Sequence, residues 1–131
     1  MNDDEIFDPV RPDDPDEQLL YLRRLRWRYP DETASVTEEQ LGTLVRTYLK
    51  NCPLLKIEHP NDVVRFLALG LLITPEQRKS ALLSTVTQRV LTASDIWSAA
   101  KRLDFIYTHV VGRPVPNPEP DFGRWFVDHD G

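Results

Sequence analysis

The stretch that decides the fold is 60-PNDVVRFLALGLL-72, in which Arg65 is the one long polar side chain among apolar residues. A helix that is apolar around its whole circumference is stable only when other helices cover it. The stretch therefore predicts a central helix that opens at Pro60, in an all-α protein. Because an unpaired guanidinium is costly to bury, it also predicts that Arg65 pairs with a carboxylate or with backbone carbonyls.

Two amphipathic helices are predicted before this stretch. Asp16 is a suitable N-cap for a helix over residues 17–28, which would stop before the next proline. Thr37 and Gln40 have the spacing of a capping box, so a second helix should begin there and end before Pro53. In both helices apolar residues recur every three or four positions, which places them on one face.

Two further helices are predicted after it. Thr74 and Gln77 form a second capping-box pattern, with a proline at the first helical position, and the helix should run to about Val90. A last helix, capped within residues 92–95, should end at Gly112, the residue type that best adopts a left-handed stop. No segment alternates long enough to predict a strand. The expected fold is a compact bundle of about five helices.

Proline and acidic residues mark the ends of this bundle. Residues 1–15 combine three prolines with five aspartates and are expected to form an acidic, extended tail. Residues 16–113 form the predicted helical domain. Residues 114–131 contain four prolines and then three aromatic side chains, so this segment is expected to pack against the bundle.

The charge distribution argues against polyanionic partners. The net charge is −5, and residues 1–17 alone hold eight acidic side chains against one arginine. Such a chain repels phosphate and anionic lipid, so neither nucleic acid nor a membrane is an expected partner. Four arginines lie within residues 23–28, but they are spread around the helix, which favours pairing with the acidic tail over a phosphate track. Cys52 is the single cysteine, which suits a reducing cytoplasm.

Motifs for catalysis, metals or cofactors are not found in the sequence. The glycines never cluster into a phosphate-binding loop, and Cys52, His59, His109 and His129 lack the spacing of metal ligands. The sequence 128-DHD-130 lies at the end of the chain, where side chains are rarely held in place. We therefore expect no catalytic residue, no metal and no cofactor, and an enzyme ranks third among the possible functions.

Aromatic residues off the predicted core faces suggest where a partner could bind. They either form a satellite core under the C-terminal segment or remain exposed as anchors for another protein. A second patch, on the first helix, consists of Leu20 and Trp27 and could instead be buried between copies of the chain. The predicted contact residues of the main patch, on the last helix and the C-terminal segment, are Trp97, Phe105, His109, Trp125 and Phe126.

Four ordered features carry a resemblance to a known group of proteins. They are 28-RYP-30 at the end of an arginine-aromatic helix, 36-VTEEQL-41, 61-NDVVRFLALGLL-72 and 101-KRLDFIY-107. In these features the chain resembles a loose group of small helical bacterial proteins that are encoded beside type VI secretion spike and effector genes. The resemblance implies an accessory role, either neutralising an effector as an immunity protein or holding it for loading as an adaptor. It implies no functional residues.

The sequence thus favours a non-catalytic protein that binds another protein, with a secreted effector as one expected partner. The alternative is a homo-oligomeric regulatory or assembly module inside the cell.

Overall fold

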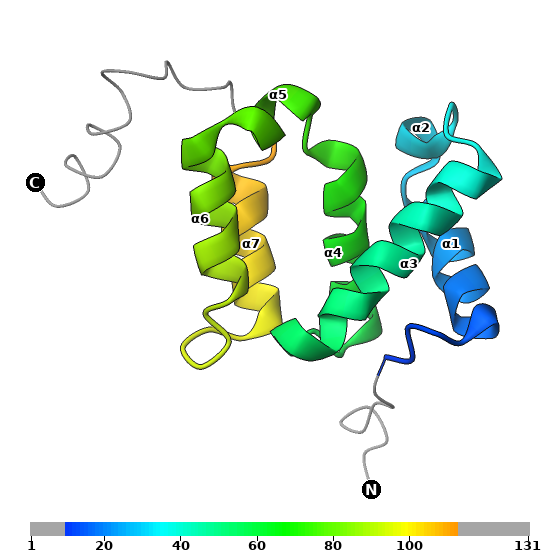
Figure 1. The fold of residues 1–131 in the computed structure, drawn as a ribbon, viewed down its shortest axis with the longest axis horizontal. Helices are drawn as coiled ribbons and strands as arrows, with labels where there is room; N and C mark the ends of the chain where they lie inside the picture. Colours follow the sequence, from blue (N-terminus) through cyan, green and yellow to red (C-terminus); the bar gives the residue numbers. More distant parts are fainter. Residues whose placement is uncertain (1–9, 113–131) are drawn as a thin grey trace, which may run out of the picture.

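The computed structural model describes residues 10–112, and this part of the chain contains helices and no strand (Figure 1). The all-α prediction is therefore confirmed. Five helices have more than ten residues, and two are short. They are α1 (Pro15–Arg28), α2 (Pro30–Thr33), α3 (Glu38–Leu55), α4 (Pro60–Leu72), α5 (Pro75–Lys79), α6 (Ala81–Leu91) and α7 (Ala99–His109).

Helix α4 is the central element, as its composition predicts. It contacts α1, α2, α3 and α7, and six of its 13 residues are buried. In Figure 1, α1 and α3 lie on one side of α4, and α6 and α7 lie on the other. Helix α6 packs against α5 and α7.

Arg65 has the partner that the sequence required. Its guanidinium lies 2.6 Å from Asp104 on α7, and it also stands over the Tyr107 ring, 5.0 Å from the ring centre. The Tyr107 hydroxyl in turn donates a hydrogen bond to the Arg65 carbonyl (2.7 Å). Burial raises the pKa of Tyr107, so this hydroxyl remains a donor at neutral pH. Arg65 therefore clamps α4 to α7.

Both predicted capping boxes are present. The Thr37 hydroxyl accepts from the Gln40 amide while the Gln40 side chain accepts from the Thr37 amide, and Thr74 and Gln77 repeat the arrangement. The first helix, however, begins earlier than predicted. Asp14, not Asp16, is its N-cap, because the proline that follows it needs no amide partner at the first helical position.

Two predicted helix ends are wrong. Helix α3 continues through Pro53 to Leu55, and it ends where Lys56 adopts a left-handed conformation and donates its amide to the Cys52 and Pro53 carbonyls. The helix predicted from Thr74 to Val90 is broken at Ser80, which ends α5 and also caps α6 by accepting from the Leu83 amide. In the second case a side-chain cap in mid-sequence competes with continued helix.

The last helix also begins later than predicted. Its N-cap is Ser98 instead of a residue within 92–95, so Ile96 and Trp97 belong to the preceding turn. Ile96 lies seven residues before Leu103, a spacing that would place it on the core face of a helix begun at residues 92–95, but it is 79 % exposed as a result of the later start. The helix also ends earlier than predicted, at His109 instead of Gly112, although Gly112 does have the predicted left-handed conformation, with φ of 77°.

The packed part of the chain includes a residue assigned to the acidic tail. Val10 is 7 % exposed and belongs to the main core, and Arg11 pairs with Glu17 (3.2 Å). Residues 10–14 therefore lie against the bundle instead of extending away from it. Phe7 and the remaining tail residues lie outside the described range.

Candidate functional site

The outer face of α1 combines exposed apolar side chains with arginines. The N-cap, the acidic first turn and the basic last turn all stabilise α1, while Tyr21, Leu22 and Leu25 bury its inner face. The opposite face carries a stripe at the spacing i, i+3, i+4 and i+7, which lies along one side of a helix. We call it the α1 stripe, and its members are Leu20, Arg23, Arg24 and Trp27.

Trp27 is the most prominent side chain of this stripe, with 80 % of its surface exposed. Leu20 is 45 % exposed, and the adjacent Leu19 is exposed as well. Only two other large apolar side chains within residues 10–112 are exposed, Leu54 and Ile96. Among the described residues, Leu20 and Trp27 of the second patch are therefore exposed, whereas Trp97, Phe105 and His109 of the first are half-buried.

A groove runs beside the α1 stripe. It consists of two adjoining hollows, of about 500 and 300 Å³, that share Arg24 and Pro60 in their linings. Arg11, Glu17 and Leu20 line the larger hollow at the start of α1. The smaller hollow lies between the end of α1 and the start of α4, and its lining residues are Arg24, Trp27, Arg28, Pro60, Asn61 and Val64.

The two ends of this groove differ in charge. The larger hollow also contains Asp14, Asp16 and Glu58, whereas the smaller one has two arginines and no carboxylate among its lining residues. The Arg24 guanidinium lies 5.3 Å from the centre of the Tyr21 ring. The pKa of the Tyr21 hydroxyl is raised, mainly because the side chain is buried. The Trp27 end can therefore accept an anionic ligand.

Arg26 has a structural role, unlike the other arginines of α1. Its guanidinium donates to the carbonyls of Thr33 and Val36, both at 3.0 Å, and so holds the α2 turn against α1. Within residues 10–112, no carboxylate lies within 4 Å of the guanidiniums of Arg23, Arg24 or Arg28. Three cationic side chains are thus available for contact.

The main patch predicted from the sequence is partly assembled by the structure. The rings of Trp97 and Phe105 are 5.6 Å apart, those of Phe105 and His109 are 4.3 Å apart, and the Lys101 ammonium lies 5.4 Å from the centre of the Trp97 ring. We call these residues the α7 ladder. All three rings are half-buried. Trp125 and Phe126 lie outside the described residues.

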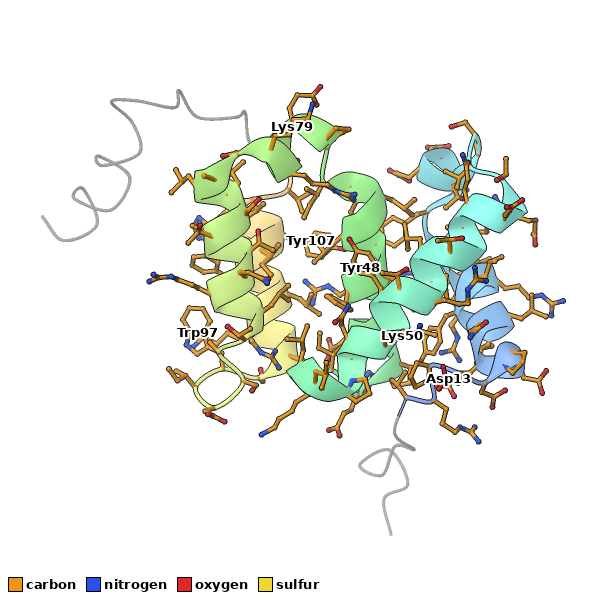
Figure 2. The ribbon with its side chains drawn as sticks, in the orientation of Figure 1. Asp13, Tyr48, Lys50, Lys79, Trp97 and Tyr107 are labelled. Atoms are coloured by element: carbon orange, nitrogen blue, oxygen red, sulfur yellow. The ribbon has the colours of Figure 1, made fainter. Side chains whose placement is uncertain are left out.

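The α7 ladder and the α1 stripe lie on opposite sides of the molecule. Figure 2 labels Trp97 beside the turn before α7, whereas α1 lies at the other end of the fold. The ladder rings already contact one another and the core, which favours the satellite-core interpretation for Trp97 and Phe105.

We predict that Trp97→Ala lowers the free energy of unfolding by about 1 to 2 kcal/mol, because it removes half-buried aromatic contacts. Urea denaturation would measure this loss. Ile96→Ala is the matched control, since Ile96 is adjacent but exposed, and its change should stay within about 0.5 kcal/mol. An unchanged stability in Trp97→Ala would instead assign the ladder to a binding surface.

A further hollow of about 440 Å³ lies among α3, α5, α6 and the end of α7. Its lining contains no carboxylate, imidazole or thiol, and its polar side chains are those of Tyr48, Gln77, Arg78, Ser84, Thr87 and Gln88. Cys52 is buried elsewhere, and burial raises the pKa of its thiol to about 12, so it is not a thiolate at neutral pH. Residues 10–112 contain no group of three or more His, Cys, Asp or Glu side chains arranged to hold a metal ion.

Arg102 is an important residue that the sequence analysis did not identify. It is almost fully buried and donates to backbone carbonyls at the ends of three helical segments. The sequence could have identified Arg102 by its position on the α7 helix. It lies three residues after Ala99 and four before Ile106, which places it beside the core face. Its role is structural, because its donors are directed at protein carbonyls.

Comparisons with known proteins found no significant match, so the function is inferred from the structure of the site. No protein-family model matches the chain, and neither a curated protein nor a solved structure is significantly similar to it. Within residues 10–112, no helix is long and apolar enough to cross a membrane.

Proposed function

We propose that this protein is a non-catalytic binding protein that contacts another protein through the α1 stripe and the groove beside it. The observation that carries the proposal is the exposure of Trp27, an aromatic side chain flanked by arginines at the edge of a hollow. Tryptophan and arginine are among the residues most enriched in binding hot spots. Exposed apolar patches that are rimmed by polar residues mark contact sites for other proteins.

The charges of the stripe favour a different protein over a second copy of this chain. In a twofold contact across α1, the central arginines, Arg23 and Arg24, would face the same arginines of the other copy. Like charges in such a contact cost free energy, whereas an acidic surface on a different protein would complement them. A homo-oligomer through α1 is therefore the less favoured alternative, and sedimentation equilibrium of the purified chain would detect it.

The resemblance to proteins encoded beside type VI secretion genes indicates which class of partner the chain binds. On that basis the partner is a secreted effector, and the chain acts as its immunity protein or adaptor in the cytoplasm. Co-expression with the product of an adjacent effector gene, followed by purification through a tag on the effector alone, tests this role. Failure of the untagged chain to co-purify would contradict the role.

The α7 ladder, with Trp125 and Phe126, remains the second proposed contact surface. It lies far from the α1 stripe, so variants at the two sites can be compared in one assay. Loss of binding in Trp125→Ala, with no loss in Trp27→Ala, would transfer the contact to this surface.

We predict that Trp27→Ala weakens effector binding by about 2 kcal/mol or more, roughly 30-fold in Kd, because it removes the aromatic anchor. The thermal midpoint should hardly change, since Trp27 is exposed in the free protein. Titration calorimetry of the purified pair measures the first effect and differential scanning calorimetry the second. Leu54→Ala, a change at another exposed apolar residue at the end of α3, is the control and should leave binding intact.

A further inference from the structure

The hollow of about 440 Å³ lies between α3 and α6, and among the described residues it shares no lining side chain with the groove beside α1. Tyr48 lines it from α3, and Ser84, Thr87 and Gln88 line it from α6. In Figure 1 these two helices lie on opposite sides of α4. Sites for small molecules usually have volumes of about 300 to 1,000 Å³. The hollow is therefore large enough to hold one.

Two hydrogen-bond donors of the lining meet at Gly70 on α4. A Cβ atom at this position would lie 2.7 Å from the Leu44 side chain and 3.1 Å from Cζ of Tyr48, the carbon that carries the hydroxyl. The Arg78 guanidinium donates through Nη2 to the Gly70 carbonyl (2.7 Å). Because Gly70 has no side chain, the Tyr48 ring can lie against the α4 backbone there. Donors from α3 and α5 are thus brought to one residue of α4.

Arg78 is the only charged side chain among the described residues that line the hollow. Within residues 10–112, no carboxylate lies within 4 Å of its guanidinium. The contact with Gly70 holds the guanidinium in place, and arginine has five N–H donors, so others remain for a ligand. A single fixed guanidinium favours a ligand with one negative charge, and its planar fork matches a carboxylate.

The α6 wall offers hydrogen-bond acceptors. Ser84, Thr87 and Gln88 are three or four positions apart, so they share one face of α6. The Ser84 hydroxyl donates to the Arg78 carbonyl and the Thr87 hydroxyl to a carbonyl of α6, both at 2.8 Å. Since their hydrogens are committed, these two oxygens accept from a ligand. Between this wall and the donors lies an apolar floor, which consists of Ile73, Leu83 and Val110.

We propose that the hollow binds a small monocarboxylate that has an apolar body and a hydrogen-bond donor at its far end. The carboxylate accepts from Arg78 and Tyr48, and the apolar body lies on the apolar floor. The far donor binds the hydroxyl oxygens of Ser84 and Thr87. The site is separate from the α1 stripe, so it gives the protein a small-molecule ligand in addition to its protein partner.

The test uses para-hydroxyphenylacetate as the probe, because it combines a carboxylate, a ring and a terminal hydroxyl. It is titrated into the full chain and followed by amide nitrogen–proton correlation spectra, with the amides of Gly70, Ser84 and Thr87 as reporters. We expect saturable shifts with a Kd of about 1 mM, an ordinary affinity for a ligand of about ten non-hydrogen atoms. Phenylacetate lacks the hydroxyl and should bind about fivefold more weakly. The uncharged para-hydroxyphenylacetamide should bind at least about tenfold more weakly.

Variants of the two donors test the orientation of the probe. Arg78→Met should weaken binding at least about tenfold, and Arg78→Lys should recover part of the loss because it restores the charge without the fork. Tyr48→Phe removes one hydroxyl and should weaken binding about fivefold. Arg89→Met, at an exposed position of α6 outside the lining, is the matched control and should bind as the unchanged chain does. Circular dichroism would show that each variant remains helical.

Absence of saturable shifts at about 10 mM probe, ten times the expected Kd, would overturn the proposal. Equal affinities for the carboxylate and the amide probes would do so as well, because binding would then not depend on charge. The same holds for equal affinities of Arg78→Met and the unchanged chain. No partner protein is used, so these outcomes leave the effector-binding proposal standing.

Discussion

Replacing Arg102 by Ala is expected to lower the free energy of unfolding by about 3 to 5 kcal/mol, the range found when one partner of a buried charged contact is removed. The guanidinium joins segments that are far apart in sequence. Its Nη1 donates to the carbonyls of Leu55 (2.8 Å) and Leu91 (2.6 Å), and its Nε donates to that of Trp97 (3.1 Å). One side chain thus fixes the ends of α3 and α6 and the start of α7.

The physical basis is that the last carbonyls of a helix have no partner within the helix. Leu55 and Leu91 are the final residues of α3 and α6, where the negative ends of two helix dipoles converge. These dipoles and the negative charge of Asp62 stabilise the Arg102 charge, although burial lowers the pKa of the guanidinium. Removal of the side chain would leave several buried carbonyls unsatisfied, at a cost of about 1 to 3 kcal/mol each.

Urea denaturation of matched variants would measure the effect. Arg102→Met retains apolar volume and should lose less stability than Arg102→Ala, while Arg102→Lys should also be destabilised because one ammonium cannot reproduce the planar fork. Arg89→Met, at an exposed position on α6, is the control and should change stability by less than about 0.5 kcal/mol. Similar losses in the Arg89 and Arg102 variants would contradict the role assigned to the buried guanidinium.

The helix starts that could be predicted are those whose caps are complete in the local sequence. The Thr37 and Thr74 boxes each satisfy two backbone amides with side chains three residues apart, so no distant contact is needed. The central position of α4 was equally predictable, because its composition allows no solvent-facing side. These features depend on spacing and composition alone.

The wrong predictions concern helix boundaries that depend on tertiary contacts. Pro53 removes one amide from α3, but Ile57, just beyond the helix, is buried and donates its amide to the Cys52 carbonyl, so the last turn is retained. Around α7 the periodic pattern included Ile96, whereas the Ser98 cap excludes it from the helix. A local pattern could not distinguish these outcomes, since the competing conformations differ mainly in distant packing.

The sequence predicted which residues belong to the candidate site, but it did not predict which of them are exposed. Sequence spacing placed Leu20 and Trp27 together off the core face, but it could not show that Trp27 is exposed while Trp97 stacks on Phe105. The groove was beyond prediction, because Pro60 and Val64 reach it from α4. Exposure depends on which helices pack beside a residue.

Phe66→Ala is expected to cost about 3 to 5 kcal/mol, while Arg65→Met, at the neighbouring position, should cost only about 1 kcal/mol. Phe66 is buried, and its ring centre lies 5.1 Å from that of Tyr48, so truncation leaves a cavity between α3 and α4. Arg65 is partly exposed, so solvent screens its pair with Asp104, and Met retains the packing of the apolar stem.

Equilibrium unfolding in urea, with equal slopes for all variants, would test this difference. Asp104→Asn removes the same ion pair from the α7 side and should match Arg65→Met, because both lose one partly screened contact. The double variant should then lose little more than either single one, as expected for two residues that share one interaction. Equal losses in Phe66→Ala and Arg65→Met would instead mean that the clamp between α4 and α7 stabilises the fold as strongly as the core does.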